Sequence, residues 1–276
     1  MTTQPCAADA SWERLDGLES RAKELMAIQL LPFEEAFRLS YEAGVIVPVL
    51  RANGKAIIDV RCGALFFKRV LNDLRGVHVL LHRGYTSQAA AVAASLHENA
   101  LAAICLFSSQ ANIDALLKSD GGKIPWSPME MAKMVVGYEG KVQGSKEFEN
   151  QWRALYAHYV WLCQCKHPTM QTTLHDTTAT TLKDGYVVMA LPNIRDQDLP
   201  YKAMISIHSL VRVHEAIQAF ASALGYKDSL PDDFGFAERF TKAKETAWSA
   251  FSPFLKAQNP VTIERTWFVK KYPLVE

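Results

Sequence analysis

The sequence lacks an excess of charge of either sign: 30 lysines and arginines oppose 29 aspartates and glutamates, for a formal net charge of +1. Bulk electrostatic attraction to nucleic acid or to an anionic membrane needs a clear basic excess, so net charge supports neither partner. Cysteine is also scarce, with 5 in 276 residues. An odd, widely spaced set makes a poor disulfide framework, and the first residues contain no basic segment followed by an apolar one. We therefore expect a cytoplasmic protein.

Motifs of several enzyme classes are missing as well. The chain contains no Gly-x-Gly-x-x-Gly, Gly-x4-Gly-Lys-Ser/Thr, Gly-x-Ser-x-Gly or His-Glu-x-x-His, and no paired Glu-x-x-His set. Rossmann enzymes, P-loop ATPases, α/β-hydrolases and di-iron bundles are therefore disfavoured. We expect no cofactor and no bound metal.

The most apolar stretch runs over residues 84–107, and its length approaches that of a membrane-spanning helix. His97, Glu98 and Asn99 interrupt it, and three adjacent polar side chains are costly in hydrocarbon. Its many alanines favour a slim helix buried in protein, near the centre of the fold. We expect no membrane partner.

Helical periodicity dominates the rest of the chain and predicts an all-α fold, a multi-helix bundle of about seven to nine helices with a short β insertion near Tyr186. Ser127-Pro-Met-Glu130 has the pattern of a capping box that begins a helix. We expect one domain over residues 1–276, with a peripheral N-terminal helix at 1–31 and a C-terminal arm at 259–276. The predicted helices span residues 11–31, 33–50, 55–82, 86–107, 145–166, 198–224 and 233–256, with one more beginning at Ser127.

Arg153 and His158 are separated by four residues within Arg-Ala-Leu-Tyr-Ala-His. This segment resembles the signature of HEPN proteins, helical domains of prokaryotic toxin and defence systems. The resemblance implies a metal-independent ribonuclease in which histidine moves the proton of an RNA 2′-hydroxyl and arginine stabilises the phosphorane. Helix positions five apart lie about 140° apart around the axis, which suits a site shared by two copies in a homodimer. The alternative is structural: a surface arginine, and a histidine packed on tryptophan.

A second resemblance covers residues 60–225 and concerns uncharacterised bacterial helical proteins distantly related to HEPN. It is carried by Arg83-Gly-Tyr-Thr-Ser-Gln, by Leu96-His-Glu98, and by a helix ending in Lys166-His167-Pro-Thr. In those proteins the late-helix histidine and the early arginine and glutamate recur, so we take His167, Arg83 and Glu98 as candidate substrate-binding residues. In the ribonuclease hypothesis, Lys166 and His167 are phosphate contacts near Arg153 and His158. The structural alternative for Arg83 and Glu98 is a partly buried ion pair between adjacent helices.

Two groups of residues have ligand chemistry suited to a metal. Cys163, Cys165 and His167 offer thiolates and an imidazole, although Cys-x-Cys-x-His is not a standard zinc spacing. His78 and His82, four apart on one predicted helix, can reach one ion, but without a neighbouring glutamate in the metalloprotease pattern they indicate an ordinary helix face.

These observations lead to one hypothesis and two alternatives. The hypothesis is a HEPN-like ribonuclease effector of a bacterial defence or toxin system, acting on RNA as a homodimer, with Arg153 and His158 as its catalytic residues. The first alternative is a non-catalytic helical interaction or sensor protein, in which the histidines and arginines are structural. The second is a helical metalloprotein that uses Cys163, Cys165 and His167.

Overall fold

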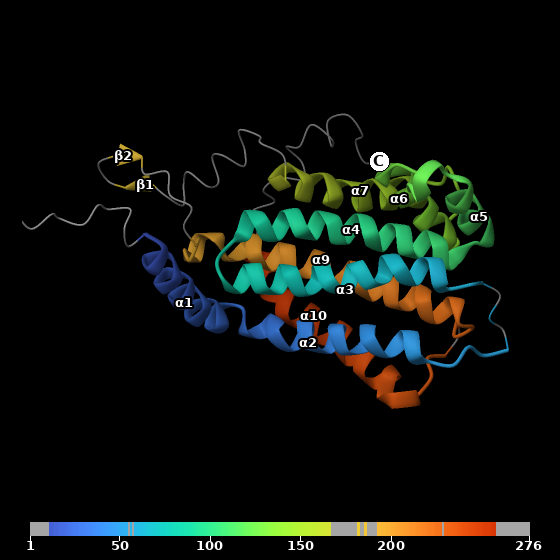
Figure 1. The fold of residues 1–276 in the computed structure, drawn as a ribbon, viewed down its shortest axis with the longest axis horizontal. Helices are drawn as coiled ribbons and strands as arrows, with labels where there is room; N and C mark the ends of the chain where they lie inside the picture. Colours follow the sequence, from blue (N-terminus) through green and yellow to red (C-terminus); the bar gives the residue numbers. More distant parts are fainter. Residues whose placement is uncertain are drawn as a thin grey trace, which may run out of the picture.

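The computed structural model describes residues 11–54, 56, 58–166, 181–182, 185–186, 192–227 and 229–257. Within them the fold is all-helical, as the sequence predicts, and it contains nine α-helices (Figure 1). Short 3-10 turns lie at Val47–Val49, Asp120–Gly122, Asp196–Asp198 and Asp233–Gly235. The α-helices are α1 (Ser11–Gln29), α2 (Leu31–Ile46), α3 (Arg61–His82), α4 (Thr86–Ser108), α5 (Gln110–Lys118), α6 (Pro128–Tyr138), α7 (Lys146–Lys166), α9 (Leu199–Ala223) and α10 (Phe236–Ala257).

Helix α4, the alanine-rich helix, lies at the centre and packs against α3, α7 and α9 (Figure 1). Its alanines are buried because small side chains let neighbouring helices approach closely. Among the described helices, α4 alone is long and apolar enough to cross a membrane by length and composition, and 72% of its most apolar window is buried inside the fold. That burial is typical of the core helix of a folded domain.

Aromatic rings join α3, α4 and α9 at one end of the core. Phe107 of α4 stacks on Phe220 of α9 with ring centroids 4.4 Å apart, and Phe67 of α3 meets Phe220 edge-on at 5.4 Å. Gly63 of α3 lies directly against the Phe107 ring. Because glycine has no Cβ, α3 can approach the ring at a distance that any other residue would prevent.

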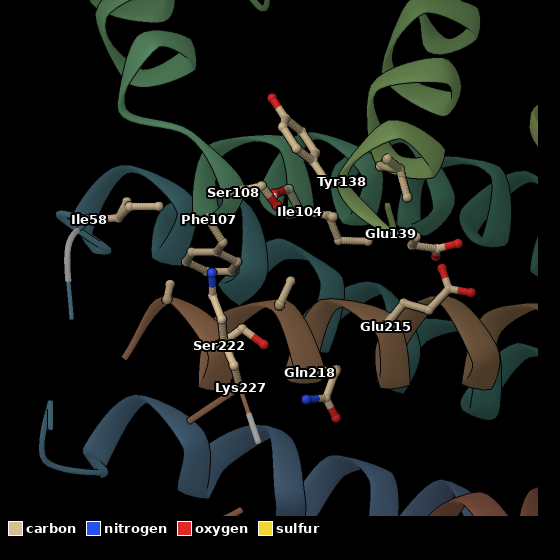
Figure 2. Close-up of a pocket in the computed structure, with 13 residues that line it drawn as sticks. Ile58, Ile104, Phe107, Ser108, Tyr138, Glu139, Glu215, Gln218, Ser222 and Lys227 are labelled. Carbon is tan, nitrogen blue, oxygen red and sulfur yellow. Dashed lines mark hydrogen bonds between the residues drawn. The ribbon is translucent and has the colours of Figure 1, made fainter. Parts of the chain in front are cut away.

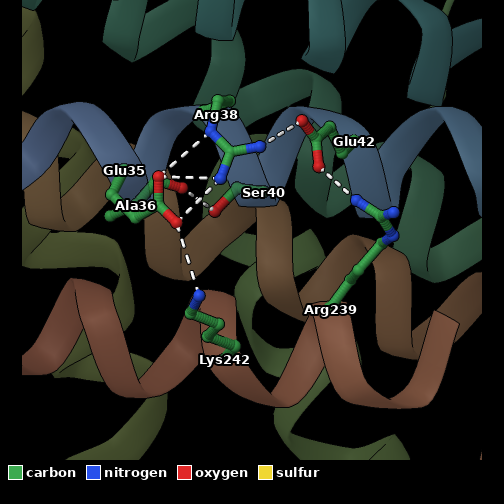
Figure 3. A network of polar contacts seen from close by, with 7 residues as sticks. All are labelled: Glu35, Ala36, Arg38, Ser40, Glu42, Arg239 and Lys242. Atoms are coloured by element: carbon green, nitrogen blue, oxygen red, sulfur yellow. Dashed lines mark hydrogen bonds and ion pairs between the residues drawn. The ribbon is translucent and has the colours of Figure 1, made fainter. Parts of the chain in front are cut away.

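Helices α2 and α10 pack side by side and cover α9. In the interior, the Ser40 hydroxyl lies 2.7 Å from Nε2 of His214, and Phe33 packs on Phe254. On the surface an ion network joins the two helices, and Figure 3 shows Glu42 accepting from Arg239 and Glu35 facing Lys242. Exposed pairs of this kind contribute little to stability, so the buried contacts hold the helices together.

Several helix boundaries differ from the prediction. The first helix ends at Gln29 rather than at Leu31, and Pro32 does not stop it but sits in the first turn of α2, where its missing N–H costs nothing. Helix α3 begins at Arg61 rather than near residue 55, and α5 was not predicted. The capping box was correct: Ser127 and Glu130 exchange hydrogen bonds at the start of α6.

The predicted β insertion corresponds to a two-residue antiparallel ladder, in which β1 (Thr181–Leu182) pairs with β2 (Gly185–Tyr186). The remainder of the predicted strand, residues 187–191, lies outside the described residues, as does the predicted C-terminal arm at 259–276.

Candidate functional site

Arg153 is held within its own helix. Its guanidinium forms an ion pair with Glu149 of α7, with 3.0 Å between Nη2 and Oε2, and lies over the ring of Trp152. The indole N–H of Trp152 donates to the same Glu149 oxygen at 3.0 Å. The side chain of Arg153 is only 19% exposed. The structural alternative places this arginine on the surface, whereas its guanidinium is partly buried against Glu149 and Trp152.

His158 lies in the interface between α7 and α9. Its ring packs on the ring of His208, with centroids 4.0 Å apart. Burial, followed by the nearby Arg212 charge, lowers the pKa of His158 to about 4, so the imidazole is neutral at pH 7. Its Nδ1 is buried and has no hydrogen-bond partner within the described part of the chain.

Two further histidines share this interface. His97 of α4 is fully buried, and neither of its ring nitrogens finds a partner among the described residues. Burial lowers the pKa values of His97 and His208, and the positive charge of Arg212 lowers both further. Three helices thus contribute one neutral imidazole each beside a single guanidinium.

The polar interface continues from Arg212 into a cavity of about 460 Å³. Arg212 forms an ion pair with Glu215 one turn along α9, and Glu215 faces Glu139, which follows α6 (Figure 2). We call the whole set the polar seam, and it consists of His97, His158, His208, Arg212, Glu215 and Glu139.

The two seam carboxylates have raised pKa values. Burial is the main cause for both; Arg212 opposes it, and the charge of Glu139 raises the pKa of Glu215 further. Gln218 and Lys227 also line the cavity, with Lys227 on the side away from the glutamates (Figure 2). A cavity with converging polar groups and shifted pKa values is the usual form of a ligand site.

The remaining predicted site residues are dispersed. Glu98 accepts a 3.4 Å hydrogen bond from the Tyr159 hydroxyl, at the edge of the seam. Arg83 instead pairs with Glu19 of α1 at 2.6 Å. The ion pair considered for Arg83 and Glu98 does not form, because the twelve helical steps from Thr86 to Glu98 span about 18 Å. Lys166 is the last residue of α7 and its side chain is outside the description, as is all of His167.

Three residues of the seam come from a single pattern that the sequence analysis missed. His208, Arg212 and Glu215 lie at positions i, i+4 and i+7 of α9, which places them on one face of a largely buried helix. A polar stripe on a buried helix signals a polar interface, because buried polar groups need partners. Glu139 carries no such signal, since it follows a helix end.

No family model, no curated protein and no solved structure matches this chain.

Proposed function

We propose that this protein is a non-catalytic helical sensor or interaction protein, and that its ligand binds in the cavity at the end of the polar seam. The main support for this proposal is the position of His158. A catalytic imidazole and its arginine must both reach the phosphate, whereas the His158 ring packs against His208 with its Nδ1 buried, and Arg153 is bound to Glu149.

The cavity walls indicate the chemistry of the ligand. Glu139 and Glu215 place two carboxylates side by side, which repel one another in a partly buried setting. An amine or guanidinium between them would relieve this repulsion and gain charge-assisted hydrogen bonds. It would also compete with Arg212 for Glu215, so binding is coupled to the imidazoles that Arg212 approaches.

A titration of small amines and guanidines tests this proposal. We expect putrescine or agmatine to raise the Tm of the full chain and to give measurable heat in calorimetry, and E139Q to abolish both effects. E238Q, an exposed site on α10, is the matched control and should bind as the wild type does. The proposal fails if neither amine binds, or if E139Q binds each as tightly as the wild type.

One observation favours a second candidate, the HEPN-like ribonuclease acting on RNA as a homodimer. His158 lies close enough to Arg212 for the charge of the guanidinium to lower the pKa of the imidazole, and an imidazole beside a guanidinium is the pair that phosphodiester cleavage uses. Labelled tRNA and mRNA incubated in chelator with wild type and with an R153A/H158N variant distinguish the two. If the wild type cleaves RNA and the variant does not, the sensor proposal is wrong and the ribonuclease is correct. If the wild type leaves RNA uncut, the result agrees with the sensor proposal.

A further inference from the structure

A second cluster of ligating side chains, which shares no residue with the polar seam, lies between α2 and α3. Glu34 of α2 meets His78 and His82 of α3, and one ligand atom from each lies within 4.8 Å of the other two. Among the described residues no other group of three histidines, cysteines or carboxylates comes as close together. Glu34 supplies the third ligand that the spacing of His78 and His82 alone does not reveal.

The distances suit a shared ion. Both Nε2 atoms face the same carboxylate oxygen of Glu34, at 2.8 Å from His78 and 3.3 Å from His82. In a tetrahedral site with bonds of about 2.0–2.1 Å, ligand atoms stand about 3.3 Å apart. The two imidazole rings are already 4.3 Å apart at their centroids, and Phe37 packs edge-on against His78. Small side-chain shifts would therefore bring all three ligand atoms within bonding distance of one ion.

We propose that Glu34, His78 and His82 form a Zn²⁺ site with at least one coordination position open to water. Two imidazoles with one carboxylate are a zinc ligand set in proteins, and three protein ligands leave a fourth position for water. Exposure agrees with this arrangement: the histidine side chains are 12% and 14% exposed, and Glu34 is 50% exposed on the solvent side.

Arg75 opposes zinc binding because it forms a hydrogen bond with His78. Its Nη1 lies 2.9 Å from Nδ1 of His78. Arginine can only donate, so Nδ1 accepts and the ring proton is on Nε2, where it is donated to Glu34. Zinc needs the lone pair of Nε2, so the ring proton of His78 must move to Nδ1, and the ring as a whole releases no proton. Because Nδ1 then donates, the exposed Arg75 must turn away. Removing Arg75 should therefore tighten binding.

The test uses the whole 276-residue chain without a histidine tag, carrying C163S and C165S so that the neighbouring thiolates at these two positions do not compete. We expect about one Zn²⁺ per chain in calorimetry, and Co²⁺ absorption bands without thiolate charge transfer. E34Q and H78N should each weaken binding at least about tenfold, and R75Q should strengthen it by up to about tenfold.

The matched control is E35Q. Glu35 is the neighbour of Glu34 but points to Arg38 and Lys242 (Figure 3), so this variant should bind Zn²⁺ as the parent does. Circular dichroism verifies that each variant folds. Stoichiometry near zero in the parent, or equal affinities for the parent, E34Q and H78N, would overturn the proposal.

Discussion

At the scale of single residues, Lys202 of α9 is a charged side chain held inside the protein. Its side chain is fully buried, and its ammonium lies 3.2 Å from Asp198, one turn earlier at the start of α9. The hydroxyl of Thr86 donates to the same carboxylate oxygen at 2.6 Å, which ties α4 to α9. Burial lowers the pKa of Lys202, and the Asp198 charge opposes that shift. The lysine is tolerated inside the protein because the carboxylate is there.

The two partners should therefore respond unequally to substitution. D198N leaves a buried ammonium without a counter-charge and should cost about 3 kcal/mol of unfolding free energy. K202M removes the buried cation and fills a similar volume, and should cost less than about 1 kcal/mol. Urea unfolding at pH 7.5 measures both. Equal losses in the two variants would show that the ammonium does not depend on Asp198.

At the scale of elements, the approach of α3 to α4 depends on Gly63. A Cβ built there would lie 2.4 Å from a ring carbon of Phe107, and that ring is fixed by its stacking on Phe220. Helix propensity favours alanine over glycine by about 1 kcal/mol. At Gly63, however, the steric conflict is larger than this gain, since neither the ring nor the helix can move freely.

We expect G63A to destabilise the protein by about 2 kcal/mol, the cost of forcing extra volume into a packed core. Gly137 of α6 provides the control, because a Cβ there meets nothing within 4 Å. G137A should be neutral or stabilising by up to about 1 kcal/mol. Thermal unfolding of the two variants measures the difference, and a stabilised G63A would mean that α3 does not pack on Phe107.

At the scale of the whole molecule, the interior contains several histidines held neutral. Burial lowers the pKa values of His158 to about 4 and His214 to about 3, and shifts those of His97 and His208 in the same direction. In the unfolded chain these groups have pKa values near 6.5. Between the lowered pKa of each folded histidine and the unfolded value of about 6.5, the unfolded chain binds more protons than the folded protein. The free energy of unfolding therefore falls as the pH is lowered through this range.

Acid should therefore unfold this protein cooperatively. The free energy of unfolding is expected to be level above about pH 7 and to fall from about pH 6.5 downward, with His158 alone contributing roughly 3 kcal/mol by pH 4. Urea midpoints at pH 7.5, 6 and 5 measure the slope. H97L removes one buried imidazole and should therefore reduce the slope of stability against pH. Identical midpoints at pH 7.5 and 5 would contradict the buried, neutral state of these histidines.

The sequence by itself determined the helical class, the central place of α4 and the start of α6 at Ser127. These properties arise from contacts three or four residues apart, or from composition within one helix, and both are visible locally. Even the missed stripe of His208, Arg212 and Glu215 was local, and a search for polar spacing on apolar helices would have found it.

Only the tertiary structure decided which of these faces meet. His97, His158 and His208 come from three helices, and Glu34 is 44 residues from His78. The tertiary structure also pairs Arg83 with Glu19 of α1. The physical reason is that packing depends on all apolar surfaces at once, so no spacing along one helix specifies the residue opposite it on another.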